Sequence, residues 1–121
     1  MIPKPDLCQL LGQTVTVTVD RPLGSTHPRH ADMVYPVNYG FLPGVIGGDG
    51  EAQDVYILGV DRPIDRFTGT VIAIIRRIDD AEDKLVAAPA GMRFSETELE
   101  TALHFQEQYF SHTIQLSKGD T

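Results

Sequence analysis

Three carboxylates lie within six residues in the segment Asp49-Gly50-Glu51-Ala52-Gln53-Asp54, and an apolar run over residues 55–58 follows at once. Crowded carboxylates repel one another, and each raises the pKa of the next unless a cation lies among them. The simplest interpretation of such a hexapeptide is an acidic surface turn. The functional interpretation is a metal site, because Mg2+ binds through one or two carboxylates together with waters and substrate phosphates.

The spacing of the three acids favours the functional interpretation. Asp49 and Glu51 are two residues apart, so on extended backbone their side chains point to the same face. Asp54 begins an expected strand, which gives it a rigid support. A second acidic segment, 79–84, is expected at a hairpin turn and can supply further ligands, although most such segments are only polar loops. Two metal ions about 4 Å apart activate a water and clamp a phosphoryl group.

Cations gather in and beside the loop 22–32, which is marked by its prolines and glycine. They are Arg21, His27, Arg29 and His30. Alone, these residues are equally well interpreted as a solvated basic loop. Beside a site for anions, they become candidates for a phosphate clamp.

Composition and charge limit the class of protein. At 121 residues we expect one domain, 1–121, with a core that needs no disulfide or structural metal. The net charge of −7 argues against nucleic acid and anionic membranes as partners, since both bind basic faces. No apolar run is long enough to span a membrane, and the start of the chain lacks the pattern of a signal peptide. The single cysteine fits a reducing cytoplasm.

The elements that must position these residues are short strands and one late helix. The strict Thr-Val alternation over 14–19 predicts a half-buried strand. Ser95 and Glu98 form a capping box, which predicts a helix over about 96–110. The other expected strands are 33–42 as one kinked or two short strands, 54–60, 68–78 and 84–88. The fold class that follows is mainly β with one C-terminal α-helix, as a small OB-like antiparallel barrel, closed or highly curved.

The segment Tyr35-Pro36-Val37-Asn38-Tyr39-Gly40-Phe41, followed after a short gap by the acidic hexapeptide, resembles the signature of soluble family I inorganic pyrophosphatases. That signature is Tyr-Pro-x-Asn-Tyr-Gly and then Asp-x-Asp-x-x-Asp on a barrel strand. The similarity continues in order over roughly residues 13–110. It implies a five-stranded OB-like barrel and Mg2+-dependent hydrolysis of pyrophosphate to two phosphates. Mn2+ is an alternative cofactor, because it accepts the same carboxylate and water ligands.

The resemblance assigns metal ligands and catalytic residues by position. Asp49, Glu51 and Asp54 match the metal-binding triplet, whose second and third members flank the attacking water, and one of these two deprotonates it. In the second acidic segment, Asp79 or Asp80, together with Asp83, matches further metal ligands. The catalytic set implied in this way is Asp54, Glu51 and Tyr39.

The resemblance also assigns residues that hold the substrate, a small phosphate anion. Tyr39 matches a tyrosine on the phosphate side, Lys84 a lysine that contacts phosphate, and Tyr109 the late phosphate-binding tyrosine. Arg29 aligns with another phosphate lysine, and Arg21 and His30 are further candidates from the basic loop. Assembly into a homo-oligomer is implied by the family alone.

Three departures from the family pattern leave alternatives open. Position 51 has glutamate in place of aspartate, which would shift a base by about 1 Å. The short segment between Arg29 and Tyr35 leads us to expect that a hairpin carrying a phosphate-binding arginine is missing. Phe110 stands where the family usually has lysine. The alternatives to a pyrophosphatase are therefore a phosphohydrolase acting on another diphosphate, and an OB-like binding module with a decayed site.

Overall fold

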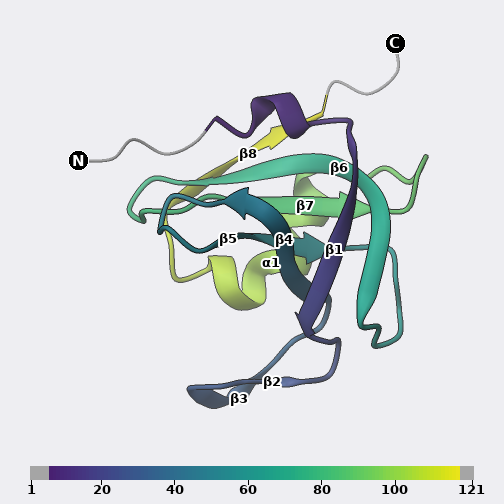
Figure 1. The fold of residues 1–121 in the computed structure, drawn as a ribbon. Helices are drawn as coiled ribbons and strands as arrows, with labels where there is room; N and C mark the ends of the chain where they lie inside the picture. The colour runs from purple at the N-terminus through teal and green to yellow at the C-terminus, as the bar shows by residue number, and fades with distance from the viewer. Residues whose placement is uncertain (1–5, 118–121) are drawn as a thin grey trace.

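Five strands close into a barrel because β1 (Thr14–Arg21) pairs with a strand on each side. The computed structural model describes residues 6–117. Around the ring the order is β1-β4-β5-β7-β6, and β6 returns to β1 (Figure 1). The other strands of the ring are β4 (Asn38–Ile46), β5 (Ala52–Ile57), β6 (Arg66–Arg77) and β7 (Lys84–Ala88). The expected small barrel is confirmed.

One pair of strands in the ring is parallel, so the barrel is mixed where the sequence led us to expect antiparallel pairing. β5 and β7 run in the same direction, with Val55 opposite Leu85. The cause is the order of the strands, because β7 lies between β5 and β6 in the sheet. β6 precedes β7 in the chain and pairs with it in antiparallel direction, which leaves β7 parallel to β5. As a result, the segments that lead into β5 and β7 lie at the same end of the barrel.

The barrel interior follows from the alternation in β1. Val17 and Val19 are buried inside, together with Val55, Ile57 and Ile74 of other strands, whereas the threonines of β1 are more exposed. The following list gives the rest of the buried interior: Leu7, Leu42, Val71, Leu85 and Ala87. The strand β4 can approach β1 closely because residue 40 is glycine, since a Cβ there would lie 1.9 Å from the carbonyl oxygen of Thr18.

The helix α1 (Glu96–Glu107) covers one outer face of the barrel (Figure 1). The predicted capping box is present: Ser95 Oγ accepts from the Glu98 backbone N–H at 3.1 Å, and Glu98 Oε1 accepts from the Ser95 N–H at 2.8 Å. The helix ends at Glu107, one turn before the expected end. A second apolar cluster joins Leu99 and Leu103 of α1 to barrel residues that include Tyr35, Tyr39, Tyr56 and Val86.

The structure adds a hairpin and a strand that were not predicted from the sequence, and a short turn before the barrel. β2 (Thr26–His27) and β3 (His30–Val34) form a short hairpin that projects from the barrel (Figure 1), in a segment where the sequence led us to expect a loop. Between Arg29 and Tyr35 there is only strand β3. β8 (His112–Leu116) extends the sheet beside β6. A 3-10 turn, η1 (Cys8–Leu10), lies before β1. In residues 6–117, no helix is long and apolar enough to cross a membrane.

Candidate active site

A cavity of about 760 Å3 opens where the segment before β7, the hairpin β2–β3 and the end of α1 meet. Charged side chains from β1, β5, β6 and β7 form one part of its lining, and aromatic side chains from the end of α1 form another. The lining residues are Arg21, His27, His30, Asp32, Met33, Val34, Tyr39, Asp54, Arg77, Glu82, Lys84, Phe105, Gln106, Gln108, Tyr109 and Phe110.

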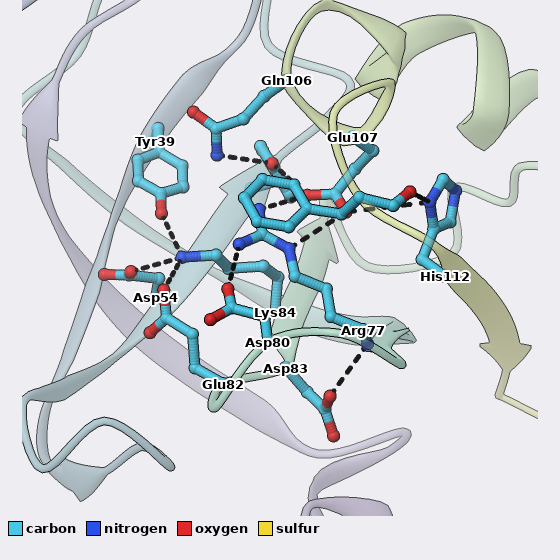
Figure 2. Close-up of polar contacts among 12 residues, drawn as sticks. Tyr39, Asp54, Arg77, Asp80, Glu82, Asp83, Lys84, Gln106, Glu107 and His112 are labelled. Atoms are coloured by element: carbon cyan, nitrogen blue, oxygen red, sulfur yellow. Dashed lines mark hydrogen bonds and ion pairs between the residues drawn. The ribbon is translucent and has the colours of Figure 1, made fainter.

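Lys84 lies at the centre of the charged part of the lining (Figure 2). Its ammonium donates to Tyr39 Oη at 2.8 Å, to Asp54 Oδ2 at 2.7 Å and to Glu82 Oε1. The lysine is only 3% exposed, so its charge acts in an environment of low dielectric. Burial, reinforced by the charge of Asp54, holds the pKa of Tyr39 well above its ordinary value, so the phenol stays protonated. Tyr39, Asp54 and Lys84, all predicted from the sequence, therefore lie together.

The two acidic segments meet at Asp49 and Glu82, whose carboxyl groups shift each other's pKa. Burial raises the pKa of Glu82 to about 7 against the attraction of Lys84, and the contact with Asp49 raises it further. Burial opposes ionisation of Asp49, but its hydrogen bonds with the Glu51 backbone N–H and with Glu82 outweigh burial and lower its pKa. Below about pH 7 these shifts favour a protonated Glu82 beside an ionised Asp49.

Glycines in the first acidic segment allow its turn to pack closely against the second acidic segment. A Cβ on Gly48 would lie 2.0 Å from the carbonyl oxygen of Ala81, so the two turns pack backbone against backbone. Gly50 has a φ of 85°, which reverses the chain before β5. Asp49 Oδ1 accepts from the Glu51 N–H at 3.0 Å, which turns its side chain toward the second segment. Glu51 itself is exposed and is not among the residues that line the cavity.

The three aspartates predicted from the second acidic segment have other partners. Asp79 accepts from the Ser111 N–H at 3.1 and 3.3 Å. Asp80 binds the guanidinium of Arg77 at 2.7 Å. Asp83 is 4% exposed and accepts from the Arg77 backbone N–H at 3.0 Å. The structure does not bring these three carboxylates together with Asp49 and Asp54.

The predicted phosphate-binding cations divide into two groups. Arg21 and His30 line the cavity, and Arg21 donates to Tyr35 Oη at 2.6 Å. Arg29 lies in the exposed turn of the hairpin β2–β3 and is not among the lining residues. Tyr109 lines the cavity and is 66% exposed, so its hydroxyl lies at the rim.

Three charged residues of the cavity, Asp32, Glu82 and Arg77, were not selected from the sequence. Side chains alternate on extended backbone, so placing Lys84 in the site also places Glu82 there and turns Asp83 to the other side. That signal was available. Arg77 ends an apolar strand, and nothing in its immediate sequence distinguishes it from Arg76. Its role depends on Glu107, which is close to it only in the folded chain.

Asp49, Glu82 and Asp54 offer the oxygen donors that a hard divalent cation prefers. Among residues 6–117, no three acidic, histidine or cysteine side chains form a ready metal cluster, and the ammonium of Lys84 lies between Asp54 and Glu82. However, Glu82 Oε2 is buried, and no donor of the described residues reaches it. Two carboxyl groups in contact need either a proton or a cation between them, and oxygen donors are the ligands that Mg2+ and Mn2+ prefer.

Comparison with known proteins identifies the family. The family model described as inorganic pyrophosphatase matches residues 12–118. The chain belongs to the inorganic pyrophosphatase family. Among curated members, the inorganic pyrophosphatase of Xanthomonas axonopodis pv. citri is 30% identical over an alignment that covers 72% of this chain and 56% of that protein. The Caulobacter vibrioides inorganic pyrophosphatase is 28% identical, with 89% and 70% covered. The chain spans about half the length of several curated pyrophosphatases that it matches.

Solved pyrophosphatase structures share the fold. The inorganic pyrophosphatase of Ehrlichia chaffeensis superposes with a TM-score of 0.67 at 19% identity, covering 96% of this chain and 92% of that one. The Neisseria gonorrhoeae inorganic pyrophosphatase gives a TM-score of 0.57 at 23% identity, with 93% and 88% covered. At these identities the structures establish the barrel and not the chemistry of the site.

Proposed function

We propose that this protein hydrolyses inorganic pyrophosphate to two phosphates with the help of Mg2+ or Mn2+. The observation that carries the proposal is the group formed by Asp54, Lys84 and Tyr39 at the cavity, next to the carboxyl groups of Asp49 and Glu82. Acidic groups for a cation and a buried ammonium for an anion lie side by side there. A metal-bound diphosphate needs both kinds of partner.

Asp49, Asp54 and Glu82 would hold the metal, and Glu51, which is exposed on the same turn, could join them. A bound divalent ion lowers the pKa of its water and stabilises negative charge on phosphoryl oxygens. Asp54 is the best placed base, because its carboxylate faces the cavity from a strand while its Oδ2 is fixed by Lys84. Asp79, Asp80 and Asp83 support the loop in this account and are not needed as ligands.

The substrate would lie between Lys84 and Arg21, with Tyr39, Tyr109 and His30 as further hydrogen-bonding groups. Lys84 and Tyr39 form a fixed donor pair on the floor, and Arg21 closes one side of the cavity. The attacking water transfers a proton to Asp54 while its oxygen bonds to phosphorus. The bridging P–O bond breaks, and the second phosphate leaves with the electron pair of that bond.

A second substrate class is favoured by the size and lining of the cavity. Its 760 Å3 exceeds the needs of two phosphoryl groups, and Met33, Phe105 and Tyr109 form an apolar part that pyrophosphate does not require. A diphosphate bearing an organic group, such as a nucleoside diphosphate, would occupy that part. The same cleavage chemistry would apply to both substrates.

The proposal is tested by phosphate release from pyrophosphate, with and without Mg2+, beside a panel of nucleoside di- and triphosphates. Turnover of pyrophosphate that needs the metal supports the proposal, and turnover confined to an organic diphosphate favours the second class. No release with Mg2+ or Mn2+ from the folded protein contradicts both and favours a binding module. We further propose that the protein acts in the cytoplasm, and sedimentation would establish whether it forms a homo-oligomer.

A further inference from the structure

Arg77 is a buried cation in the wall of the cavity, and the proposed hydrolysis gives it no role. It lies at the end of β6 and is 4% exposed. Its guanidinium donates to Glu107 Oε1 at 3.1 Å and Oε2 at 2.7 Å, and to Asp80 Oδ2 at 2.7 Å (Figure 2). The ring of Phe110 lies against it, with its centroid 3.7 Å from Cζ.

Glu107, the partner of Arg77 on α1, is itself held in place by hydrogen bonds. Glu107 is 1% exposed and also accepts from Tyr56 Oη at 2.6 Å. Tyr56 in turn accepts from Gln106 Nε2 at 2.7 Å. A planar guanidinium that is bound along two edges and stacked on a ring keeps a single orientation. Arg77 is therefore a rigid positive charge that needs no ligand to hold it in place.

Arg77 and Arg76 interact with two carboxylates of the second acidic segment that were expected to bind metal. Asp80 binds the guanidinium of Arg77 through Oδ2 and the Ala81 N–H through Oδ1, at 2.7 Å in both cases. Asp83 accepts from the Arg77 backbone N–H and lies 3.7 Å from the guanidinium of Arg76. A divalent ion at Asp80 would have to displace a guanidinium and would be repelled by it.

We propose that Arg77 is a built-in cation of the phosphate cavity that takes the place of a divalent metal ion at the second acidic segment. Metal loading is then confined to Asp49, Asp54 and Glu82. Arg77 and Lys84 are two cationic groups of the cavity lining, and Arg77 balances the charge of Asp80 as a metal ion there would. The inference rests on the proposed metal-dependent function and specifies which residues load the metal.

The test counts Mn2+ ions bound per chain, by the electron paramagnetic resonance signal of free Mn2+ at equilibrium with the protein. Asp80→Asn is expected to leave the number and affinity of bound ions within about twofold of wild type, whereas Asp54→Asn weakens binding at least tenfold. Asp61→Asn, which changes an exposed acid outside the cavity lining, is the matched control. Loss of a bound ion in Asp80→Asn would overturn the role of Arg77.

A second variant examines Arg77 itself. Arg77→Gln alone leaves the buried carboxylate of Glu107 without its cation, so it is combined with Glu107→Gln, and folding is checked by circular dichroism. The folded double variant is expected to bind one additional Mn2+ at the released carboxylate of Asp80, and an unchanged count would contradict the proposal. If the double variant does not fold, the Asp80→Asn result decides. Absence of Mn2+ binding in the wild type would contradict the proposed metal-dependent function as well, whereas a loss confined to Asp80→Asn would not.

Discussion

The ammonium of Lys84 lies 2.7 Å from Asp54 Oδ2, and this ion pair joins the first acidic segment to the strand that follows the second. Glu82 binds the same ammonium, so two carboxylates share one buried positive charge. The side-chain exposures are 4% for Lys84, 28% for Asp54 and 12% for Glu82. Together with Asp49, three carboxylates surround one ammonium, so a divalent cation would balance the charge of the group when all three are ionised.

Lys84→Met tests how much this group depends on its ammonium. Removing one member of a buried ion pair costs about 3–5 kcal/mol, and the partial exposure of Asp54 places the expected loss near the lower end. Added Mg2+ should restore more stability to the variant than it adds to the wild type, because a dication can replace the ammonium between the carboxylates. Urea denaturation measures both effects. Arg66→Met, at an exposed arginine, is the control, and an equal response to Mg2+ in both proteins would contradict the prediction.

Asp54→Asn tests the metal site without changing side-chain size. At a hundred times its dissociation constant, a ligand stabilises the folded state by about 2.7 kcal/mol. The wild-type melting temperature should therefore rise with Mg2+, and that of Asp54→Asn should not. Asp61→Asn should behave as the wild type. An undiminished rise in Asp54→Asn would place the metal elsewhere.

Glu82→Gln tests the raised pKa of Glu82 through the pH dependence of stability in metal-free protein. The pKa of Glu82 is raised by burial from 4.5 to about 7, so between these values the folded state binds more protons than the unfolded state. The contribution of Glu82 to the free energy of unfolding therefore falls as the pH rises from about 4.5 to about 7, by at most on the order of 3 kcal/mol. Glu82→Gln should lose this decline. Denaturant titrations with chelator across that range measure the difference, and parallel curves for the two proteins would show that the raised pKa is wrong.

Arg21 and Arg29 test which basic residue holds the substrate. Arg21 lines the cavity, whereas Arg29 is exposed in the hairpin turn. Arg21→Gln should raise KM for the diphosphate about tenfold, equivalent to about 1.4 kcal/mol, because it removes a charge near the phosphates. Arg29→Ala should change KM less than about twofold if the hairpin keeps this position. The opposite order of effects would restore Arg29 as the principal clamp.

The elements that the sequence predicted well are those with a strong local signal. The Thr-Val alternation led to β1, and the capping box at Ser95 led to α1. By contrast, β8 is a five-residue strand at the edge of the sheet, and its pairing with β6 is visible only in the folded chain. The hairpin β2–β3 was missed because two residues, Thr26 and His27, make up one of its strands.

The sequence indicated which types of residue meet at the cavity better than it indicated which side chains point into it. Tyr39, Asp54 and Lys84 were selected correctly as neighbours, because strands in register bring them together. In the second acidic segment, the density of aspartates drew attention to Asp83, whereas alternation places Glu82 in the cavity. Arg77 could not be selected, since its partner Glu107 is on the helix and their distance depends on how α1 packs on the barrel.

The most direct test of the central claim is phosphate release from inorganic pyrophosphate by the purified wild-type protein, measured with Mg2+ and with chelator. The cavity and its acidic and basic groups predict turnover with the metal, no turnover without it, and at least a hundredfold loss in Asp54→Asn. Metal-independent release, or equal release by Asp54→Asn, would contradict the proposed role of this site. No release from the folded protein with Mg2+ or Mn2+ would contradict the proposed hydrolysis of pyrophosphate itself.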